Sequence, residues 1–457
     1  MSQANLNVEQ AIEKRNFGEL RDALDNLPPY EVGSLIGEMS AEQRVLAFRV
    51  LPRELAADAF EYLPFDIQQE LLKSLGQEQV AAILNEMAPD DRTHLLDELP
   101  GNVTNQLLNL LTPEERNVAV QLLGYPESSI GRLMTSDYVR LRPDWTVEYA
   151  LGHIRRHGHD SETLNVVYVI DDGGKLIDDI RIRKLLLASP DAKVADEMDD
   201  SFVSLMAADD QETAVDAMRR SDMTALPVTD SDGVLVGIVT IDDVLDVAAA
   251  EATEDIQKFG GMEALDEPYL KIAFFRMVRK RAGWLVILFL GEMLTATAMG
   301  FFENEIEKAV VLALFVPLII SSGGNSGSQA ATLVIRAMAL TEVTLSDWWR
   351  VMRREVFTGL ALGSILGSIG FLRVSLWSAF SDIYGEHWLL VAMTVGISLI
   401  GIVLWGTLSG SMLPFVLRRA GIDPATSSAP FVATLVDVTG LIIYFAVAMV
   451  ILRGTLL

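Results

Sequence analysis

Five long apolar stretches, separated by short polar connections, fill the carboxyl-terminal part of the chain. They lie near residues 282–302, 309–337, 355–380, 388–413 and 427–452. Each is long enough for the roughly 20 residues that an α-helix needs to cross a bilayer. The pattern therefore predicts a transmembrane domain of five helices over residues 271–457. Residues 1–270 contain no such stretch, so we expect neither a signal peptide nor a membrane span there.

Basic residues flank alternate connections between these stretches. They are Arg276, Arg279, Lys280 and Arg281 before the first stretch, Arg336, Arg350, Arg353 and Arg354 around the loop after the second, and Arg418 and Arg419 after the fourth. Positively charged loops stay in the cytoplasm. We therefore expect a multi-pass protein of the inner (plasma) membrane, with a cytoplasmic amino terminus and an external carboxyl terminus.

A second pattern, with a period of twelve residues, occupies residues 1–128. The apolar positions that recur at this interval are Leu27, Met39, Leu51, Leu63, Leu75, Met87, Leu99, Leu111 and Leu123. Each unit has the length of one short helix and a turn. Stacked units would share a continuous apolar spine, so the period predicts an all-α superhelical domain.

Residues 129–242 contain a tandem repeat. Segments that begin at Leu133 and Glu197 match position by position, sixty-four residues apart. Each copy predicts a strand, a helix, two strands joined by an Asp/Gly turn and a final helix, which is an α/β pattern. The repeat resembles a pair of CBS domains. That resemblance implies ATP as a candidate ligand, because Thr240 and Asp243 match the Thr/Ser-x-x-Asp that holds ribose in many such pairs. The first copy has Arg181-Ile-Arg-Lys184 instead.

Charge separates the two parts of the chain. Residues before Lys271 include 52 acidic and 22 basic side chains, whereas the remainder has 11 acidic and 14 basic. The acidic part would repel nucleic-acid phosphates and attract cations. With no cysteine, disulfides and thiolate metal sites are excluded. Cations are therefore the expected partners, and nucleic acid is not.

Asp437 lies near the middle of the fifth apolar stretch. An acid at this depth costs about 2.5–3.5 kcal/mol on insertion scales. It would therefore either bond another helix or snorkel, or else face a wet ion path. The second stretch favours the path, because Asn325, Ser326, Ser328 and Gln329 add neutral oxygens there. Gly323, Gly324 and Gly327 permit either close helix approach or an unwound turn with free carbonyls.

Carboxylate, amide and carbonyl oxygens suit a hard divalent cation. One acid in each chain is too few to hold such an ion, so a two-fold dimer with Asp437 from both chains is expected. Magnesium gives up its water reluctantly, so the ion would keep most of its hydration shell.

Residues 243–270 predict an acidic connecting helix that ends at Gly260-Gly261. Asp243, Asp246, Glu251 and Glu254 place like charges at helical spacing, which destabilises a helix unless a cation intervenes. The acids either form a solvated face or gather with acids of the other cytoplasmic domains.

Four motifs make the chain resemble the MgtE magnesium channels over essentially its whole length. They are "GGNSGSQAATLVIRA", "LRRAGIDPA", "PFVATLVDVTGLIIYF" and "TIDDVLDVAAAEATEDI". The resemblance implies a homodimeric, Mg²⁺-selective uptake channel in which Asp437 holds hydrated Mg²⁺ and Asp423 is a second pore acid. The pore-lining positions it implies are Gly323, Gly324, Asn325, Gln329 and Ala429.

The same resemblance implies cytosolic Mg²⁺ sites that close the channel. The matching acids are Asp243, Asp246, Glu251 and Glu254 in the connector, Glu212 and Asp222 in the second repeat, and Asp58 and Asp90 in the helical domain.

Two other functions remain open from the residues. One is an ion-coupled secondary transporter of divalent cations that uses the same membrane acid. The other is an intramembrane aspartyl protease, which needs two facing acids. Only Glu292 would partner Asp437 within one chain, and we expect no enzymatic activity.

Overall fold

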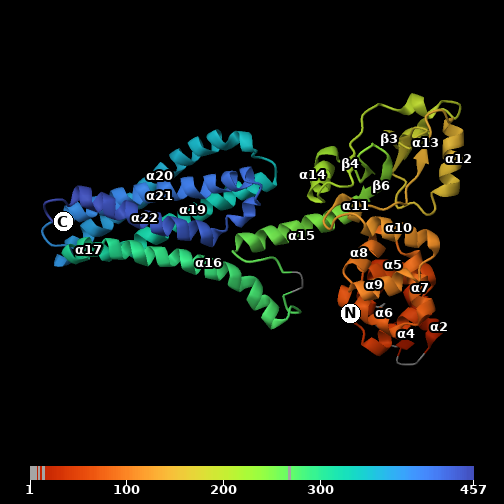
Figure 1. Cartoon of the computed structure of the whole chain (residues 1–457), viewed down its shortest axis with the longest axis horizontal. Helices are drawn as coiled ribbons and strands as arrows, with labels where there is room; N and C mark the ends of the chain where they lie inside the picture. The colour runs from red at the N-terminus through yellow and green to blue at the C-terminus, as the bar shows by residue number, and fades with distance from the viewer. Residues whose placement is uncertain (1–7, 9–10, 13–15, 266–268, 457) are drawn as a thin grey trace. The chain divides into compact units, whose positions relative to one another are not determined.

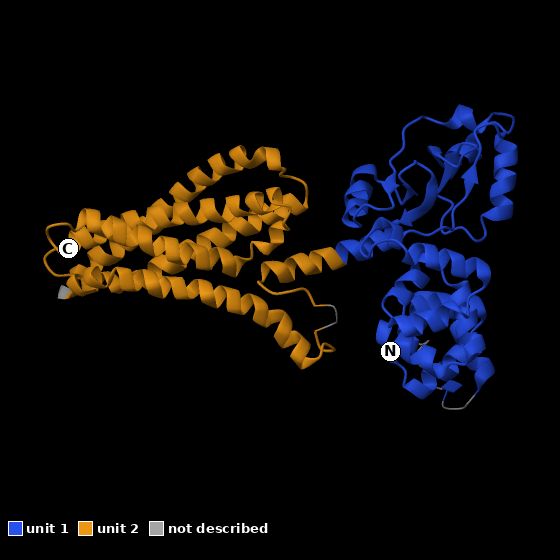
Figure 2. Ribbon diagram, viewed as in Figure 1, with its two compact units in different colours: residues 1–249 blue, residues 250–457 orange. Residues whose placement is uncertain are grey.

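The computed structural model describes residues 8, 11–12, 16–265 and 269–456. It divides into two compact units, residues 1–249 and 250–457, which are described separately below (Figures 1 and 2). The division falls inside helix α15 (Ile241–Phe259). This helix is the connector that the sequence predicts, and it ends immediately before Gly260.

Short helices joined by tight turns form the first part of unit 1. They are α2 (Phe17–Asp25), α3 (Pro29–Glu38), α4 (Ala41–Val50), α5 (Arg53–Glu61), α6 (Phe65–Ser74), α7 (Gln77–Glu86), α8 (Pro89–Asp97), α9 (Gly101–Leu108) and α10 (Pro113–Leu123). From α3 to α10 each helix begins twelve residues after the last. The predicted period is therefore confirmed. Its apolar residues Leu63, Leu75 and Met87 lie at the turns, buried in the shared core.

A polar set follows the same period, and the apolar pattern alone did not reveal it. Side chains of Arg44, Gln68, Arg92 and Thr104 each donate a hydrogen bond to the carbonyl eight residues earlier, at 2.9–3.3 Å. Carbonyls at helix ends lack partners within their own helix. These side chains supply partners for them and so tie consecutive repeats together.

The CBS-like repeat forms two sheets in unit 1. The first copy contains β1 (Arg140–Leu141), α12 (Val147–His157), β2 (Val166–Ile170), β3 (Leu176–Arg181) and α13 (Ile182–Leu187). The second contains β4 (Leu205–Met206), α14 (Glu212–Ser221), β5 (Ala225–Thr229) and β6 (Leu235–Thr240), followed by α15. In each sheet the first strand runs parallel to the second, and the third runs antiparallel to it. The predicted order of elements is confirmed.

Equivalent turns join the last two strands of each copy. Asp171 Oδ1 accepts from two backbone N–H groups of its turn, and Asp230 Oδ1 does the same in its own. The turns also pair with each other, because Leu176 donates its N–H to Gly233 and Leu235 to Gly174. Both glycines have positive φ, +79° and +83°, which other residues rarely adopt. The two copies therefore pack pseudo-symmetrically.

Unit 2 is a bundle of long helices. They are α16 (Phe274–Phe301), α17 (Glu303–Lys308), α18 (Val310–Ala313), α19 (Val316–Ala339), α20 (Trp348–Ser378), α21 (Trp388–Arg419) and α22 (Ala429–Ile451). Within the described residues, five helical segments are long and apolar enough to cross a membrane, as predicted. The bundle core lies among α19, α21 and α22. Helix α16 packs on α22 but is otherwise mostly exposed.

Candidate functional site

Asp437 lies midway along α22 with its carboxylate against α19. A Cβ added to Gly324 would stand 3.4 Å from Asp437 Oδ1, so the carboxylate lies in van der Waals range of this position on α19. The carboxylate is half-buried and makes no hydrogen bond or ion pair with any described residue. The alternative that Asp437 forms a hydrogen bond to another helix is therefore excluded for the described residues.

A stripe of polar residues runs along α19 beside this carboxylate. Ser321, Asn325 and Gln329 recur every four residues and are exposed in the single chain. Asn325 Nδ2 donates to Ser321 Oγ at 3.3 Å. Ser328 Oγ donates to the Ala429 carbonyl at 3.1 Å, which links this part of α19 to the start of α22. Of the predicted lining residues, Asn325 and Gln329 are exposed, Ala429 is half-buried, and Gly323 and Gly324 are buried.

The glycines of α19 serve close packing rather than an unwound turn. Helix α19 is continuous from Val316 to Ala339, so its mid-span carbonyls stay in the helix. A Cβ on Gly323 would come within 2.7 Å of both Ile402 and Val436. A Cβ on Gly410 would stand 2.0 Å from the carbonyl oxygen of Gly327. Three helices therefore meet with their backbones nearly touching.

Asp423, the second predicted pore acid, is paired. It precedes the short η4 (Pro424–Thr426), where its Oδ1 accepts from the Ala425 N–H at 2.8 Å. Its Oδ2 accepts from Lys258 Nζ at 2.7 Å. The same ammonium group bonds Glu254 one turn earlier on α15. Two of the predicted metal ligands, Asp423 and Glu254, are therefore both ion-paired with Lys258, a residue that was not among the predicted site residues.

A cluster of acids gathers in unit 1, where α5, α8, the segment before β1, the loop after α12 and the start of α15 come together. We call it the acidic cluster. Its members are Asp58, Glu61, Asp90, Asp91, Asp137, Glu162, Asp242, Asp243 and Asp246. The predicted acids Asp58, Asp90, Asp243 and Asp246 are therefore brought together. The other five acids were not predicted, although Glu61 lies one turn after Asp58 on α5 and Asp91 follows Asp90 on α8.

Burial and mutual repulsion perturb these carboxyl groups strongly. Burial, with the charges of Asp91 and Asp58, raises the pKa of Glu61 to about 9. Burial, together with Asp242 and Asp91, raises the pKa of Asp243 to about 7 despite a hydrogen bond from Thr240. Burial and Asp243 also raise the pKa of Asp90 well above its usual value. Such a group of oxygens favours a hard cation, which would remove the repulsion.

The remaining predicted ligands do not join this cluster. Glu212 begins α14 and Asp222 follows its last residue, so about 15 Å of helix separates them and one ion cannot bind both within a chain. Glu251 and Glu254 fall in unit 2. Within the described residues, no three acidic or imidazole side chains converge closely enough to form a preformed metal site.

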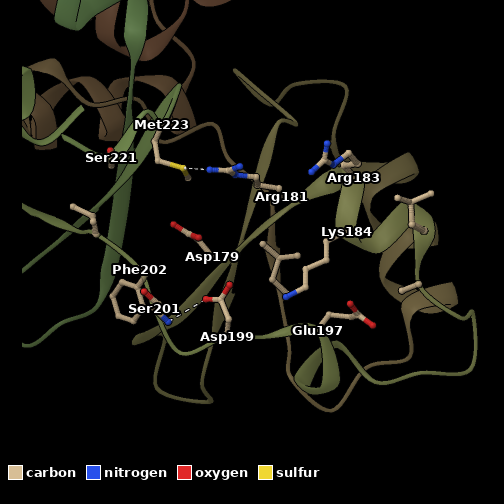
Figure 3. A pocket seen from close by; sticks show the side chains of 14 residues that line it. Asp179, Arg181, Arg183, Lys184, Glu197, Asp199, Ser201, Phe202, Ser221 and Met223 are labelled. Carbon is tan, nitrogen blue, oxygen red and sulfur yellow. Dashed lines mark hydrogen bonds between the residues drawn. The ribbon is translucent and has the colours of Figure 1, made fainter. Parts of the chain in front are cut away.

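A cavity of about 900 Å³ opens in the CBS pair, between β3 and α13 of the first copy and the start of the second copy (Figure 3). Its charged lining residues are the basic Arg181, Arg183 and Lys184 and the acidic Asp179, Glu197 and Asp199. The predicted ribose ligands Thr240 and Asp243 are elsewhere. Thr240 Oγ1 donates to Asp243 Oδ2 at 2.8 Å, and Asp243 belongs to the acidic cluster.

Family models match three parts of the chain. Residues 27–128 match the MgtE intracellular N domain, and residues 130–191 and 194–250 match the CBS domain. Residues 316–447 match a divalent cation transporter model. These segments correspond to the short-helix repeats, the two sheets and the membrane bundle.

Two relatives match over nearly their full length. The chain is 39% identical to magnesium transporter MgtE of Thermus thermophilus, covering 98% of both chains. It is 30% identical to magnesium transporter MgtE of Bacillus subtilis, covering 94% of this chain and 93% of the relative.

Solved structures match about half of the chain. The cytosolic domain of the Mg²⁺ channel MgtE in complex with ATP matches with 34% identity and a TM-score of 0.52, over 53% of this chain and 99% of that one. The soluble part of a magnesium transporter matches with 29% identity and a TM-score of 0.53, over 55% and 98%. Given the full-length relatives, the five helices that are long and apolar enough to cross a membrane, and the matches to the N domain and the CBS domain, this chain belongs to the MgtE family of magnesium transporters.

Proposed function

We propose that the protein is a Mg²⁺-selective channel that mediates magnesium uptake as a homodimer. The observation that carries this proposal is the carboxylate of Asp437, unpaired within the described chain at mid-membrane depth beside the polar stripe of α19. Amides and hydroxyls are not stable facing lipid, so this face must be covered by protein or line water. A second copy with a water-filled space between the chains would satisfy both needs.

A two-fold axis near α19 and α22 would bring two Asp437 carboxylates to one site. Magnesium exchanges its inner waters reluctantly, so the carboxylates, Asn325 and Gln329 would bind the hydration shell rather than the metal. Binding of this kind attracts the ion yet allows it to leave, as conduction requires. In this arrangement the carboxyl terminus lies outside the cell, and both cytosolic domains lie inside.

We further propose that cytosolic Mg²⁺ closes the channel through the acidic cluster. Burial and the charges of neighbouring members both disfavour the ionised carboxylates, which raises their pKa values. A divalent cation near Asp90, Asp91 and Asp243 would relieve it only while the helical domain, the CBS pair and α15 stay together. Ions that bind the closed state more tightly shift the equilibrium toward it, and an almost complete switch needs about 5.5 kcal/mol.

The direct test combines transport with two variants. Asp437→Ala should abolish uptake in a magnesium-requiring host, whereas Glu386→Gln, in an exposed acid between α20 and α21, should leave it unchanged. Normal growth of the Asp437→Ala strain would refute the ion path. Single-channel recording at varied internal Mg²⁺ separates a channel from an ion-coupled carrier, because a carrier cannot exceed its turnover rate.

An adenine nucleotide is a second candidate ligand, favoured by the cavity in the CBS pair. Three basic side chains there suit phosphates, and a relative's cytosolic domain has been solved with ATP. The other proposed position remains Thr240 and Asp243. Calorimetric titration with ATP distinguishes the two positions. Lys184→Ala should weaken ATP binding only if the cavity holds the nucleotide. Thr240→Ala should weaken it only if the nucleotide binds at Thr240 and Asp243.

A further inference from the structure

Helices α16 and α22 lie side by side, in parallel and in register. A Cβ on Gly291 would stand 2.7 Å from Thr434 Cγ2, and the rings of Phe302 and Phe445 stack with centroids 4.8 Å apart. Both contacts join residues that are 143 positions apart in the chain. Eleven residues therefore separate the two contacts on each helix, which fixes the relative depth of every residue between them.

Glu292 lies at nearly the same depth as Asp437. In this register Asp437 is level with Leu294, so Glu292 is two residues away, or about 3 Å along the helix axis. The register therefore places two carboxyl groups at nearly the same depth on neighbouring helices. Glu292 is exposed in the single chain and makes no hydrogen bond or ion pair with the described residues.

A buried hydroxyl without a partner lies at the same level. Thr295 is 6% exposed, and its Oγ1 has no hydrogen-bond partner among the described residues. Gly291 and Thr295 are four residues apart and share one face of α16. Because Gly291 meets α22, the hydroxyl faces the helix that carries Asp437. An orphaned polar atom at this position indicates an unseen polar species, such as water around an ion.

We propose that Glu292 is a second carboxylate of the ion path and, with Asp437, draws the hydrated divalent cation to this depth. The inference rests on the proposed function of Asp437. An acid facing acyl chains is costly, and two acids that repel each other there cost more. A cation held through its waters removes both costs, and the Thr295 hydroxyl can bond the same waters. A dimer would then present four carboxylates rather than two.

A proton shared by Glu292 and Asp437 is the competing arrangement, and it predicts a different response. A shared proton lets the pair carry one charge instead of two. Transport would then depend on pH, and replacing Glu292 would abolish that dependence. If the pair binds a cation instead, replacing Glu292 should raise the Mg²⁺ concentration that transport needs.

The test uses the full-length protein in liposomes containing a magnesium indicator. Glu292→Gln should raise the half-saturating Mg²⁺ concentration about ten-fold, because one charge beside the ion is lost. Glu292→Asp should restore most of the affinity, and Glu307→Gln, in an exposed acid after α16, is the matched control. Glutamine lowers the cost of burial in lipid, so this variant should fold, which thermal unfolding in detergent verifies.

Each outcome decides between the proposals. Unchanged half-saturation in Glu292→Gln overturns the inference, and so does a variant that loses only its pH dependence. Asp437→Asn is measured in parallel. If it abolishes uptake while Glu292→Gln behaves like the wild type, only the role of Glu292 fails. If Asp437→Asn transports normally, the ion path itself fails.

Discussion

Lys258 Nζ lies 2.7 Å from Asp423 Oδ2, so the end of α15 is ion-paired to the segment that leads into α22. Burial opposes the charged form of Lys258, but hydrogen bonds to Asp423 and Glu254 outweigh it and raise the pKa of the lysine. Phe259 packs with Val432 and Val436 of α22 in the same region. The lysine therefore occupies a position between two carboxylates that a divalent cation would also favour.

Removing this lysine should loosen the connector. We expect Lys258→Met to open the channel at internal Mg²⁺ concentrations that close the wild type, with about a five-fold rise in open probability, because a partly exposed ion pair contributes about 1 kcal/mol or less. Lys258→Arg keeps the charge and serves as the control. Patch-clamp recording across internal Mg²⁺ measures the effect, and identical closure in Lys258→Met would contradict it.

The tightest glycine contact should tolerate no side chain. Gly410→Ala would place its Cβ 2.0 Å from a backbone oxygen of α19, so α19 and α21 must separate. We expect less monodisperse protein after extraction in detergent. The matched change Gly401→Ala meets only the Ile443 Cγ2 at 3.5 Å and should be neutral. Size-exclusion chromatography compares the two, and equal profiles would argue against the packing described for α19 and α21.

Without divalent ions, the acidic cluster should destabilise unit 1 as pH rises. The folded pKa values of Glu61 and Asp243 are about 9 and about 7, above the usual 4.5 and 3.8. A raised carboxyl pKa means that stability is fully present at low pH and is lost as pH rises through the folded value. In EDTA, the backbone amides of α5 and α8 should therefore exchange faster as the pH rises from 5 to 9. The increase should exceed the rise expected for unprotected amides.

Magnesium supplies the control for this pH series. If cations bind the cluster, millimolar Mg²⁺ should restore protection at pH 8–9 and have little effect near pH 5, where the carboxyls are protonated. The Glu61→Gln variant should show a weaker pH dependence. Protection that is independent of both pH and Mg²⁺ would contradict the charge repulsion assigned to these residues.

Arg92 should be essential to the stability of the helical domain. Its side chain is 0% exposed, bonds the Leu84 carbonyl at 3.1 Å and pairs with Glu115 at 2.5 Å. Arg92→Met would leave these oxygens without their partner and should cost about 2–4 kcal/mol. Arg116→Met, one residue beyond Glu115 and exposed, should cost less than about 0.5 kcal/mol. Thermal unfolding followed by circular dichroism tests the difference.

Patterns that repeat over many residues were readable without coordinates. The twelve-residue spacing of Leu and Met, the two CBS copies and the five apolar stretches each arise from a local rule of helix length, strand pairing or bilayer thickness. The same is true of the end of α15 at Gly260, where glycine favours helix termination. Asp437 could also be identified from the sequence, because it is an acidic residue within an otherwise apolar stretch.

Tertiary structure alone decided which of these acids meet and what neutralises them. Asp58 and Asp243 are 185 residues apart in the chain yet share the acidic cluster, whereas Glu212 and Asp222 are ten residues apart and cannot bind one ion within the same chain. The pairing of Lys258 with Asp423 and the common depth of Glu292 and Asp437 likewise depend on how helices dock. Helical periodicity determines on which side of its own helix a residue lies. How closely two helices pack, and in which register, depends on the volumes of all side chains in the interface between them.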